Sequence, residues 1–492
     1  MLRAAAVFSD HMVLQRERPV VVFGEADAPV TATIDVVRAE AIPFEGRFRL
    51  TLPPMPAGGP YELALTSGEE AVVFTDVMIG EVWLCGGQSN MEFMLQNGKG
   101  GAAEAAEADD AMLRFYTVNQ EAEVDAAMLE RERATAWKPL KPGTCGDVSA
   151  VAYYAGRRLR EELGVAVGML VCCVGGTEIS NWISREALNT LPEGRDALAE
   201  FEKSIEGIRP EAFARENDAY NARVAKWCEG AEALHRKNPD IRAEAIVAAV
   251  GDFPWPPPTG PGMLRRPGNL WRTMAARVAP YGARGLFWYQ GETDSGHPGR
   301  YAALFSALIE DWRRGFENES LCVVAAQLPN FGADPAAEDW PGIRAAQMRV
   351  CDGTRGCALA CLLDCGETGD IHPWDKRLPG RRMADLALAH AYGRSIDAEA
   401  PRLEFARLTD RGIALCFSEK IGPIRGDRRS LRANGKPANA RVDDGALIVE
   451  AAAPVKIAYA MENDPAACLF GRGGLPVFPF EIEVKEENGH EH

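Results

Sequence analysis

The fold is organised around the stretch Val77-Met78-Ile79-Gly80-Glu81-Val82-Trp83-Leu84-Cys85-Gly86-Gly87-Gln88-Ser89. Up to Cys85 it is mostly apolar, β-branched and aromatic, which is typical of a strand buried in a parallel sheet. The glycine pair then lets the backbone turn at little steric cost. Ser89 therefore follows the carboxyl end of a buried strand, where open α/β sheets place their ligands. Taken alone, these residues favour a simpler interpretation, an ordinary turn that caps a helix.

From Val77 onward the sequence alternates between strand and helix patterns. Further buried strands are predicted at 165–171, 284–289, 321–328 and 358–363, and helices at 149–163 and 301–316. Repeated alternation with right-handed crossovers predicts a three-layer α/β domain with a parallel sheet over residues 77–396. An insert at about 196–267 is first helix-prone and then rich in proline. Its Trp-Pro stretch at 253–262 is irregular, and either lines a sugar site or forms a surface linker.

The regions on either side of this domain have a different pattern. Residues 1–76 alternate short β-prone runs with turns, which predicts a small sandwich-like module. Residues 397–486 are predicted to form a second β-rich module. For the charged tail at 487–492 we expect no ordered structure.

Composition limits the classes of partner. A formal charge of −17 over 492 residues argues against nucleic acids and anionic membrane surfaces, since both require basic patches. No apolar run reaches the roughly 18 residues of a membrane span, and no signal peptide is visible. We therefore expect a cytoplasmic protein, or a secreted one if a leader has been removed. The twelve cysteines contain no CxxC pair, so buried thiols are expected rather than a zinc site.

Ser89 can act as a nucleophile only if a base removes its proton. Among seven histidines, His372 is the strongest candidate, because it follows the last predicted strand of the α/β domain and precedes a helix. Asp370 is two residues upstream. In an extended segment this spacing places both side chains on one face, where the carboxylate would orient the imidazole ring.

Four ordered blocks carry a resemblance to a known family: Gly87-Gln88-Ser89-Asn90-Met91-Glu92, Gly175-Gly176-Thr177 with Trp182, Trp288-Tyr289-Gln290-Gly291-Glu292, and Asp370-Ile371-His372-Pro373. In this order they resemble the sialate O-acetylesterase family of the SGNH hydrolase group. The segments 10–16 and 474–480 resemble the opening and the close of the same family. Nearly the whole chain is covered, and four ordered blocks are far more specific than any one of them.

The resemblance implies roles for individual residues. Ser89 would be the nucleophile, His372 the general base and later acid, and Asp370 the orienting carboxylate. The oxyanion hole would consist of the backbone N–H groups of Ser89 and Gly176 and the side-chain amide of Gln290. Four further residues are assigned to substrate binding or support of the site: Asn90, Gly175, Thr177 and Glu292.

The sequence departs from the family pattern in two places. Many SGNH enzymes have an aspartate three residues before the histidine, where this chain has Gly369, so a Ser-His dyad assisted by a backbone carbonyl is the alternative to a triad. Glu178 adds a charge where a proline or an apolar residue is expected, which affects the expected substrate preference.

The resemblance predicts a serine esterase that removes O-acetyl groups from sialic acid or related glycans through an acetyl-enzyme, with no metal and no cofactor. Its partner would be a small-molecule or oligosaccharide substrate, and the oligomeric state stays open. One alternative is an acetyl-xylan or hemicellulose deacetylase with the same machinery. The other is a non-catalytic carbohydrate-binding protein, against which the intact set of Ser89, His372 and Gln290 argues.

Overall fold

The computed structural model describes residues 1–485, so the predicted tail at 487–492 and position 486 lie outside the described residues. The chain divides into two compact units. Unit one contains Met1–Gln290, Ala303–Val323 and Trp374–Ala384. Unit two contains Gly291–Ala302, Val324–Pro373 and the chain from Asp385 onward.

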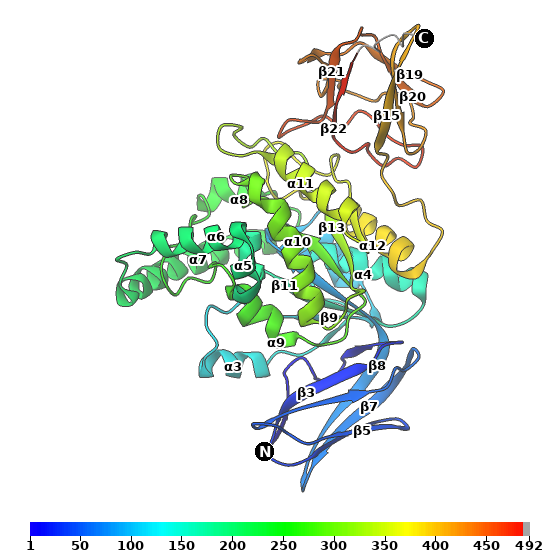
Figure 1. Ribbon diagram of the computed structural model, residues 1–492. Helices are drawn as coiled ribbons and strands as arrows, with labels where there is room; N and C mark the ends of the chain where they lie inside the picture. Colours follow the sequence, from blue (N-terminus) through cyan, green and yellow to red (C-terminus); the bar gives the residue numbers. More distant parts are fainter. Residues whose placement is uncertain (486–492) are drawn as a thin grey trace. The chain divides into compact units, whose positions relative to one another are not determined.

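Unit one is organised around β8 (Glu70–Gly87), a strand of 18 residues (Figure 1). Its first half pairs antiparallel with β7 (Gly58–Ser67). Its second half pairs parallel with β11 (Val167–Cys173) and β12 (Gly285–Tyr289). The boundary drawn from the sequence between residues 76 and 77 falls inside this strand, which serves both an antiparallel and a parallel sheet.

The parallel part of unit one has the strand order β10-β9-β11-β8-β12, with β10 (Lys138–Leu140) as an antiparallel edge beside β9 (Asp110–Thr117). Helix α4 (Ala150–Leu163) packs on β9 and β11 through a face of alanines, Tyr153 and Leu159. The strands and the helix predicted here are confirmed, and the fold class is α/β.

The strands before β8 form two antiparallel groups. One consists of β1 (Leu2–Ala4), β3 (Val20–Ala26) and β6 (Arg47–Leu52), and the other contains β4 (Val30–Ile34), β5 (Val37–Ala41) and β7. Burial alternates along β4 and β6, as expected of strands with one solvated face. The short β2 (Val13–Gln15) runs parallel to β8.

The predicted insert is helical and then irregular. Helix α5 (Arg185–Thr190) precedes it. The helices of the insert are α6 (Pro192–Ser204), which begins a few residues before the predicted boundary, α7 (Pro210–Lys237) and α8 (Ala243–Val250), and a loop without regular structure follows from Gly251 to about residue 268. The remaining short elements of unit one are α1 (Ser89–Glu92), η1 (Leu95–Asn97), α2 (Gly101–Glu107), α3 (Ala126–Arg133), η2 (Ile179–Trp182), η3 (Trp271–Ala275) and α9 (Ala276–Val278).

Three elements belong partly to each unit: α10 (Pro298–Gly315), β13 (Cys322–Ala326) and α12 (Arg377–Tyr392). In unit two, the N–H of Gln327 after β13 bonds to Ala360 O of β14 (Cys357–Ala360) at 2.9 Å, and α11 (Trp340–Gly353) packs on β14. The C-terminal strands form two four-stranded antiparallel sheets. Their members are β15 (Leu403–Thr409), β16 (Gly412–Phe417), β20 (Ala446–Val449) and β19 (Ala440–Asp443) in one, and β18 (Lys436–Pro437), β17 (Leu431–Ala433), β21 (Val455–Tyr459) and β22 (Phe480–Val484) in the other.

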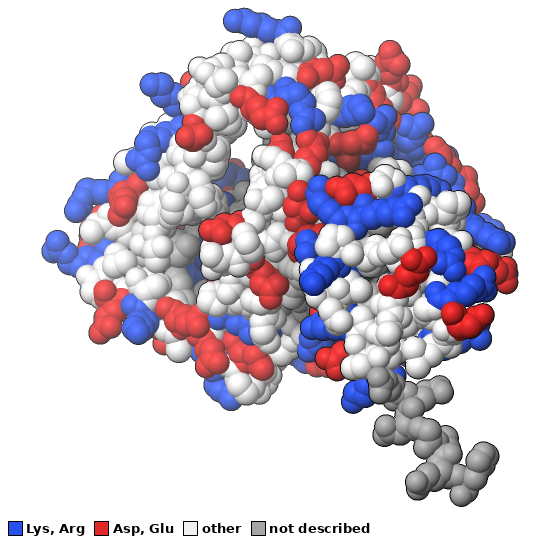
Figure 2. All heavy atoms as spheres, turned by 90° about the horizontal axis from the view of Figure 1, so that it is seen from above, with Lys and Arg blue, Asp and Glu red and all other residues white. Residues whose placement is uncertain are grey.

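Acidic and basic side chains are interspersed over the face of the molecule seen in Figure 2. Within residues 1–485, no helix is both long and apolar enough to span a bilayer.

Candidate active site

Three adjacent parallel strands end in register in unit one. Gly87 at the end of β8 lies opposite both Cys173 of β11 and Tyr289 of β12. Two backbone bonds continue this register, from Val174 N to Gly87 O (3.1 Å) and from Gln88 N to Tyr289 O (3.0 Å). The carboxyl ends of parallel strands share one edge of the sheet. Ser89, the Gly175-Gly176 turn and Gln290 therefore emerge at the same edge.

The turn into Ser89 depends on Gly87. This residue has a φ of +135°, and a Cβ at this position would lie 2.0 Å from the backbone oxygen of Tyr289. Only glycine fits such a conformation and such a close approach. The half-buried Ser89 then begins helix α1. The predicted glycine turn after the buried strand is confirmed.

A carboxylate links this turn to the next one. Glu92 Oε2 accepts the N–H of Gly175 at 2.6 Å, and Gln120 Nε2 donates to Glu92 Oε1 at 2.5 Å and to Cys173 O at 3.1 Å. A Cβ on Gly175 would lie 3.2 Å from the Cβ of Ser89, so the glycine loop is in close contact with the serine. The sequence motif contained Glu92, but sequence reasoning gave it no role.

The buried Gln290 is tied to the glycine loop. Its Nε2 donates to Thr177 O at 3.0 Å, and the Thr177 hydroxyl donates to Val174 O at 2.8 Å and accepts the indole N–H of Trp182 at 3.0 Å. An amide nitrogen carries two hydrogens, and one of them serves this bond. The side chain of Thr177 holds the loop together.

Arg265, which sequence reasoning missed, fixes the orientation of the loop. Its Nε donates to Gly175 O at 2.8 Å. In a trans peptide the C=O of Gly175 and the N–H of Gly176 point in opposite directions. The arginine therefore turns the Gly176 N–H away from itself. Burial lowers the pKa of Arg265, although the negative charge of Glu92 acts in the opposite direction.

A buried lysine supports the residue after the serine. Lys376 is 2% exposed, and its Nζ donates to Asn90 Oδ1 at 2.5 Å. It also lies 4.8 Å from the ring centroid of Phe93, a cation–π contact. Asn90 is fully buried and is held by this contact, which supports the start of α1. No local pattern around residue 376 pointed to this pair.

His372 and Asp370 lie in unit two. Asp370 Oδ1 accepts the backbone N–H of His372 at 2.8 Å, whereas Nδ1 of the imidazole is 4.0 Å from the same oxygen. The second distance is longer than a hydrogen bond but within range of an ion pair. The side chain of His372 is 40% exposed and that of Asp370 is 16% exposed, so the ring is accessible.

Glu292, another predicted supporting residue, also lies in unit two and is 4% exposed. Its backbone oxygen accepts the hydroxyl of Ser295 at 2.7 Å. The structure thus brings Ser89, Gly176 and Gln290 to one edge of unit one, and places His372, Asp370 and Glu292 in unit two.

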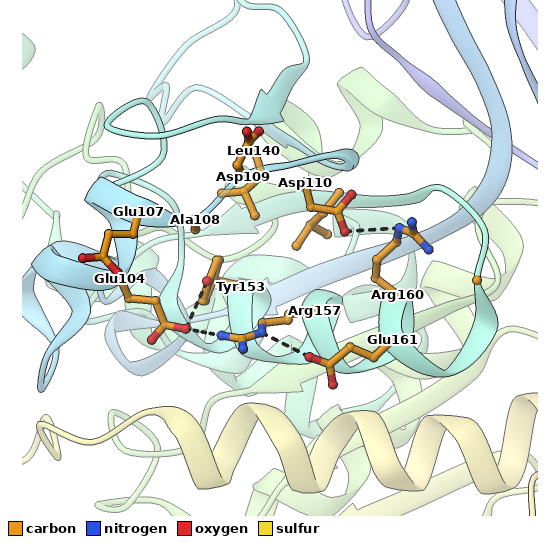
Figure 3. A pocket seen from close by; sticks show the side chains of 12 residues that line it. Glu104, Glu107, Ala108, Asp109, Asp110, Leu140, Tyr153, Arg157, Arg160 and Glu161 are labelled. Carbon is orange, nitrogen blue, oxygen red and sulfur yellow. Dashed lines mark hydrogen bonds and ion pairs between the residues drawn. The ribbon is translucent and has the colours of Figure 1, made fainter.

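A cavity of about 590 Å³ in unit one is lined by charged residues of α2, β9 and α4 (Figure 3). Glu104 accepts the hydroxyl of Tyr153 at 3.1 Å and pairs with Arg157, and Arg160 pairs with Asp110 at 3.3 Å. None of the predicted site residues lines this cavity, and both of its arginines pair with carboxylates of the lining. Among residues 1–485, no cluster of three or more His, Cys, Asp and Glu side chains could hold a metal ion.

Comparison with known proteins identifies the class. A family described as "Carbohydrate esterase, sialic acid-specific acetylesterase" matches residues 79–209 and 262–361. The sialate O-acetylesterase of Rattus norvegicus is 26% identical over 484 residues, covering 87% of this chain and 81% of the rat protein. That of Mus musculus is 28% identical and covers 80% and 74%. The structure of a carbohydrate acetylesterase from Xanthomonas citri has a TM-score of 0.74 at 25% identity and covers 98% of this chain and 99% of that one.

The protein is therefore a carboxylic ester hydrolase of the carbohydrate esterase class. Within that class, the chain belongs to the sialate O-acetylesterase family, and the resemblance seen in its sequence motifs is confirmed.

Proposed function

We propose that this protein hydrolyses O-acetyl esters of sialic acid or related glycans through an acetyl-Ser89 intermediate. The observation that carries the proposal is the shared sheet edge, where Ser89 is in close contact with the Gly175-Gly176 loop and Gln290 is bonded to that loop. The names of the relatives supply the substrate class. The architecture we propose is a three-layer SGNH-type domain over 77–396, with β-rich modules at 1–76 and 397–486, the first of which shares strand β8 with the domain.

In the proposed reaction, Ser89 Oγ attacks the ester carbonyl carbon and its proton passes to His372. The resulting oxyanion accepts hydrogen bonds from the N–H groups of Ser89 and Gly176 and from the Gln290 amide. As the intermediate collapses, the C–O bond to the sugar breaks and the sugar oxygen takes the proton from His372. Water then attacks the acetyl-enzyme by the same steps and releases acetate and Ser89.

Two contacts support Gly176 as an oxyanion donor. Arg265 holds Gly175 O at 2.8 Å, which directs the next N–H to the opposite side of the peptide plane. Glu92 holds Gly175 N at 2.6 Å, so the peptide bonds on both sides of Gly175 are fixed. Preorganised donors stabilise an oxyanion because they need no reorganisation during the reaction.

The assignment of His372 is supported by its place in the chain. It precedes Lys376 by four residues, and Lys376 binds Asn90, the neighbour of Ser89 in sequence. We propose that Asp370 orients its imidazole and that the reaction uses neither a metal nor a cofactor.

Replacement of the nucleophile tests the proposal. Ser89→Ala is expected to lower kcat for acetate release from O-acetylated sialic acid by at least about a thousandfold, because no acetyl-enzyme forms. Ser204→Ala, which removes an exposed hydroxyl at the end of α6, serves as the control and should retain full activity. Unchanged kcat in the Ser89→Ala variant would show that the nucleophile lies elsewhere. Assays with acetylated xylo-oligosaccharides in parallel decide the sugar class.

A further inference from the structure

We propose that Trp255 is a carbohydrate-binding platform beside the acyl site, which favours sugar acetates over other acetate esters. This inference rests on the proposed function of Ser89 and names the residue that would contact the sugar.

Trp255 contacts Gly176, and the preceding residue, Gly175, contacts Ser89. A Cβ on Gly176 would lie 2.2 Å from the indole Cη2, and a Cβ on Gly175 would lie 3.2 Å from the Cβ of Ser89. Consecutive Cα atoms are about 3.8 Å apart, so these contacts place the indole edge within about 12 Å of the Cβ of Ser89. A sugar whose acetyl group reaches Ser89 therefore comes close to the indole.

The loop that carries Trp255 is fixed at both ends. The indole N–H of Trp227 on α7 donates to Gly251 O at 2.8 Å, and its ring packs edge-on against Phe253 at 5.2 Å. At the other end, a Cβ on Gly260 would lie 2.1 Å from the ring of Phe213, which shows how closely the loop approaches α7. Prolines at 256–258 restrict the backbone further. A fixed aromatic side chain loses little conformational entropy when a ligand binds.

Trp255 is also exposed, which distinguishes it from most other tryptophans of the chain. It is 54% exposed, whereas six of the ten, including Trp182 and Trp288 beside the site, are less than 2% exposed. The guanidinium carbon of Arg265 lies 5.6 Å from the indole centroid and supports the ring. An accessible apolar ring with a polar N–H suits a pyranose, which has an apolar C–H face and hydroxyl groups at its edge.

Trp255 belongs to a segment of the chain that does not match the family. The family description matches residues 79–209 and 262–361, so α7, α8 and the Trp255 loop lie between the two matched parts. Trp255 thus lies outside the residues that match the family, whereas Ser89, Gly176 and Gln290 lie within them. This is expected of a residue that selects the substrate and takes no part in the shared chemistry.

The test compares a sugar ester with a small aryl ester. For Trp255→Ala, the ratio of kcat/KM on O-acetylated sialic acid to kcat/KM on 4-nitrophenyl acetate should fall about tenfold, mainly through KM, because a stacking contact of this kind contributes about 1.4 kcal/mol. Trp255→Phe should recover part of the ratio, since a smaller ring remains. Phe44→Ala, which removes an exposed ring from the connection between β5 and β6, is the control and should leave the ratio unchanged.

An equal loss on both esters, or no change on either, would overturn the proposal, because Trp255 would then only hold Gly176 or do nothing. Calorimetric titration of the deacetylated sugar separates this result from a failure of the proposed function. Binding that disappears in Trp255→Ala supports the platform even if the wild type cleaves no sugar ester. Absence of binding to the wild type overturns it.

Discussion

At the scale of single residues, the geometry of Asp370 is compatible with two roles, one in shaping the backbone before His372 and one in orienting its imidazole ring. Its Oδ1 accepts the N–H of His372 at 2.8 Å and lies 4.0 Å from Nδ1 of the ring. The first contact is an Asx turn, which shapes the backbone, whereas the second allows the carboxylate to stabilise an imidazolium. The resemblance favours a triad, and Gly369 at the position three residues before the histidine favours a dyad.

Asp370→Asn distinguishes these roles, because asparagine preserves the turn but removes the charge. If Asp370 orients and stabilises His372, kcat should fall on the order of 10⁴-fold with little change in KM, as a triad aspartate does when amidated. We expect this result, measured by steady-state kinetics on a soluble acetate ester.

Asp427 offers a matched control for this substitution. Its Oδ1 accepts the N–H of Arg429 at 2.9 Å in an equivalent turn on the exposed surface. Asp427→Asn should therefore leave kcat unchanged. A decrease of less than about tenfold for Asp370→Asn, roughly 1.4 kcal/mol, would instead favour a dyad whose ring is held by a backbone carbonyl.

At the scale of elements, the end of β8 controls the position of Ser89. The strand is buried without interruption from Val77 to Gly87, and the turn begins where a positive φ and a close backbone contact coincide. The two neighbouring strands end at the same level, so a shift of β8 would separate Ser89 from both loops.

Gly87→Ala tests this dependence. The added methyl group would meet the carbonyl oxygen of Tyr289 at 2.0 Å in a left-handed backbone conformation, so we expect a loss of about 3 kcal/mol or more in the free energy of unfolding. Esterase activity should fall with it, because β8 and β12 must move apart. Chemical denaturation and kinetics measure both effects.

Gly299→Ala is the corresponding control, since nothing lies within 4 Å of a Cβ at this position in the first turn of α10. It should be neutral or slightly stabilising. Wild-type stability and activity in the Gly87→Ala variant would show that the turn is not strained as described.

At the scale of the whole molecule, a buried carboxylate joins distant parts of unit one. Glu81 on β8 binds Arg16 at 2.5 Å, Gln15 at 2.9 Å and Arg284 at 3.1 Å, and its side chain is fully buried. Burial by itself raises the pKa of Glu81, but the bonds and charges of Arg284 and Arg16 outweigh it and lower the pKa below its usual value. The ionised form therefore stabilises the fold.

The sign of the pH dependence follows from the lowered pKa. The stabilisation is complete above the unfolded-state value of about 4.3 and is lost as the pH falls through the folded-state value. Glu81→Gln should lower the free energy of unfolding by about 3 kcal/mol near neutral pH, because two arginines lose their partner, and should flatten its dependence on pH below about 4.5.

Glu40→Gln is the control for this substitution, because it removes a carboxylate from an exposed ion pair. The side chain of Glu40 is 63% exposed and that of its partner Arg38 is 64% exposed. This change should alter the free energy of unfolding by less than about 1 kcal/mol. Equal effects of the two substitutions on the denaturation midpoint would contradict a special role for the Glu81 network.

The features that could be predicted from the sequence are local. The buried run ending in Gly86-Gly87 identified β8 and the turn to Ser89, the strand and helix periods identified the α/β class, and the ordered motifs identified the family. Such features are readable because hydrophobic period and glycine conformation act over a few residues. The continuity of β8 across residues 76 and 77 was not readable, because one strand can change partners without a change in its own pattern.

The distant side chains that hold the site became known from the tertiary structure alone. Glu92 reaches Gly175 across 83 residues, Arg265 reaches the same glycine across 90, and Lys376 reaches Asn90 across 286. Trp255 meets Gly176 from an irregular loop whose sequence allowed either a linker or a sugar site. An arginine, a lysine or a glutamate has no periodic pattern that names its partner, so these contacts arise only when packing brings the segments together.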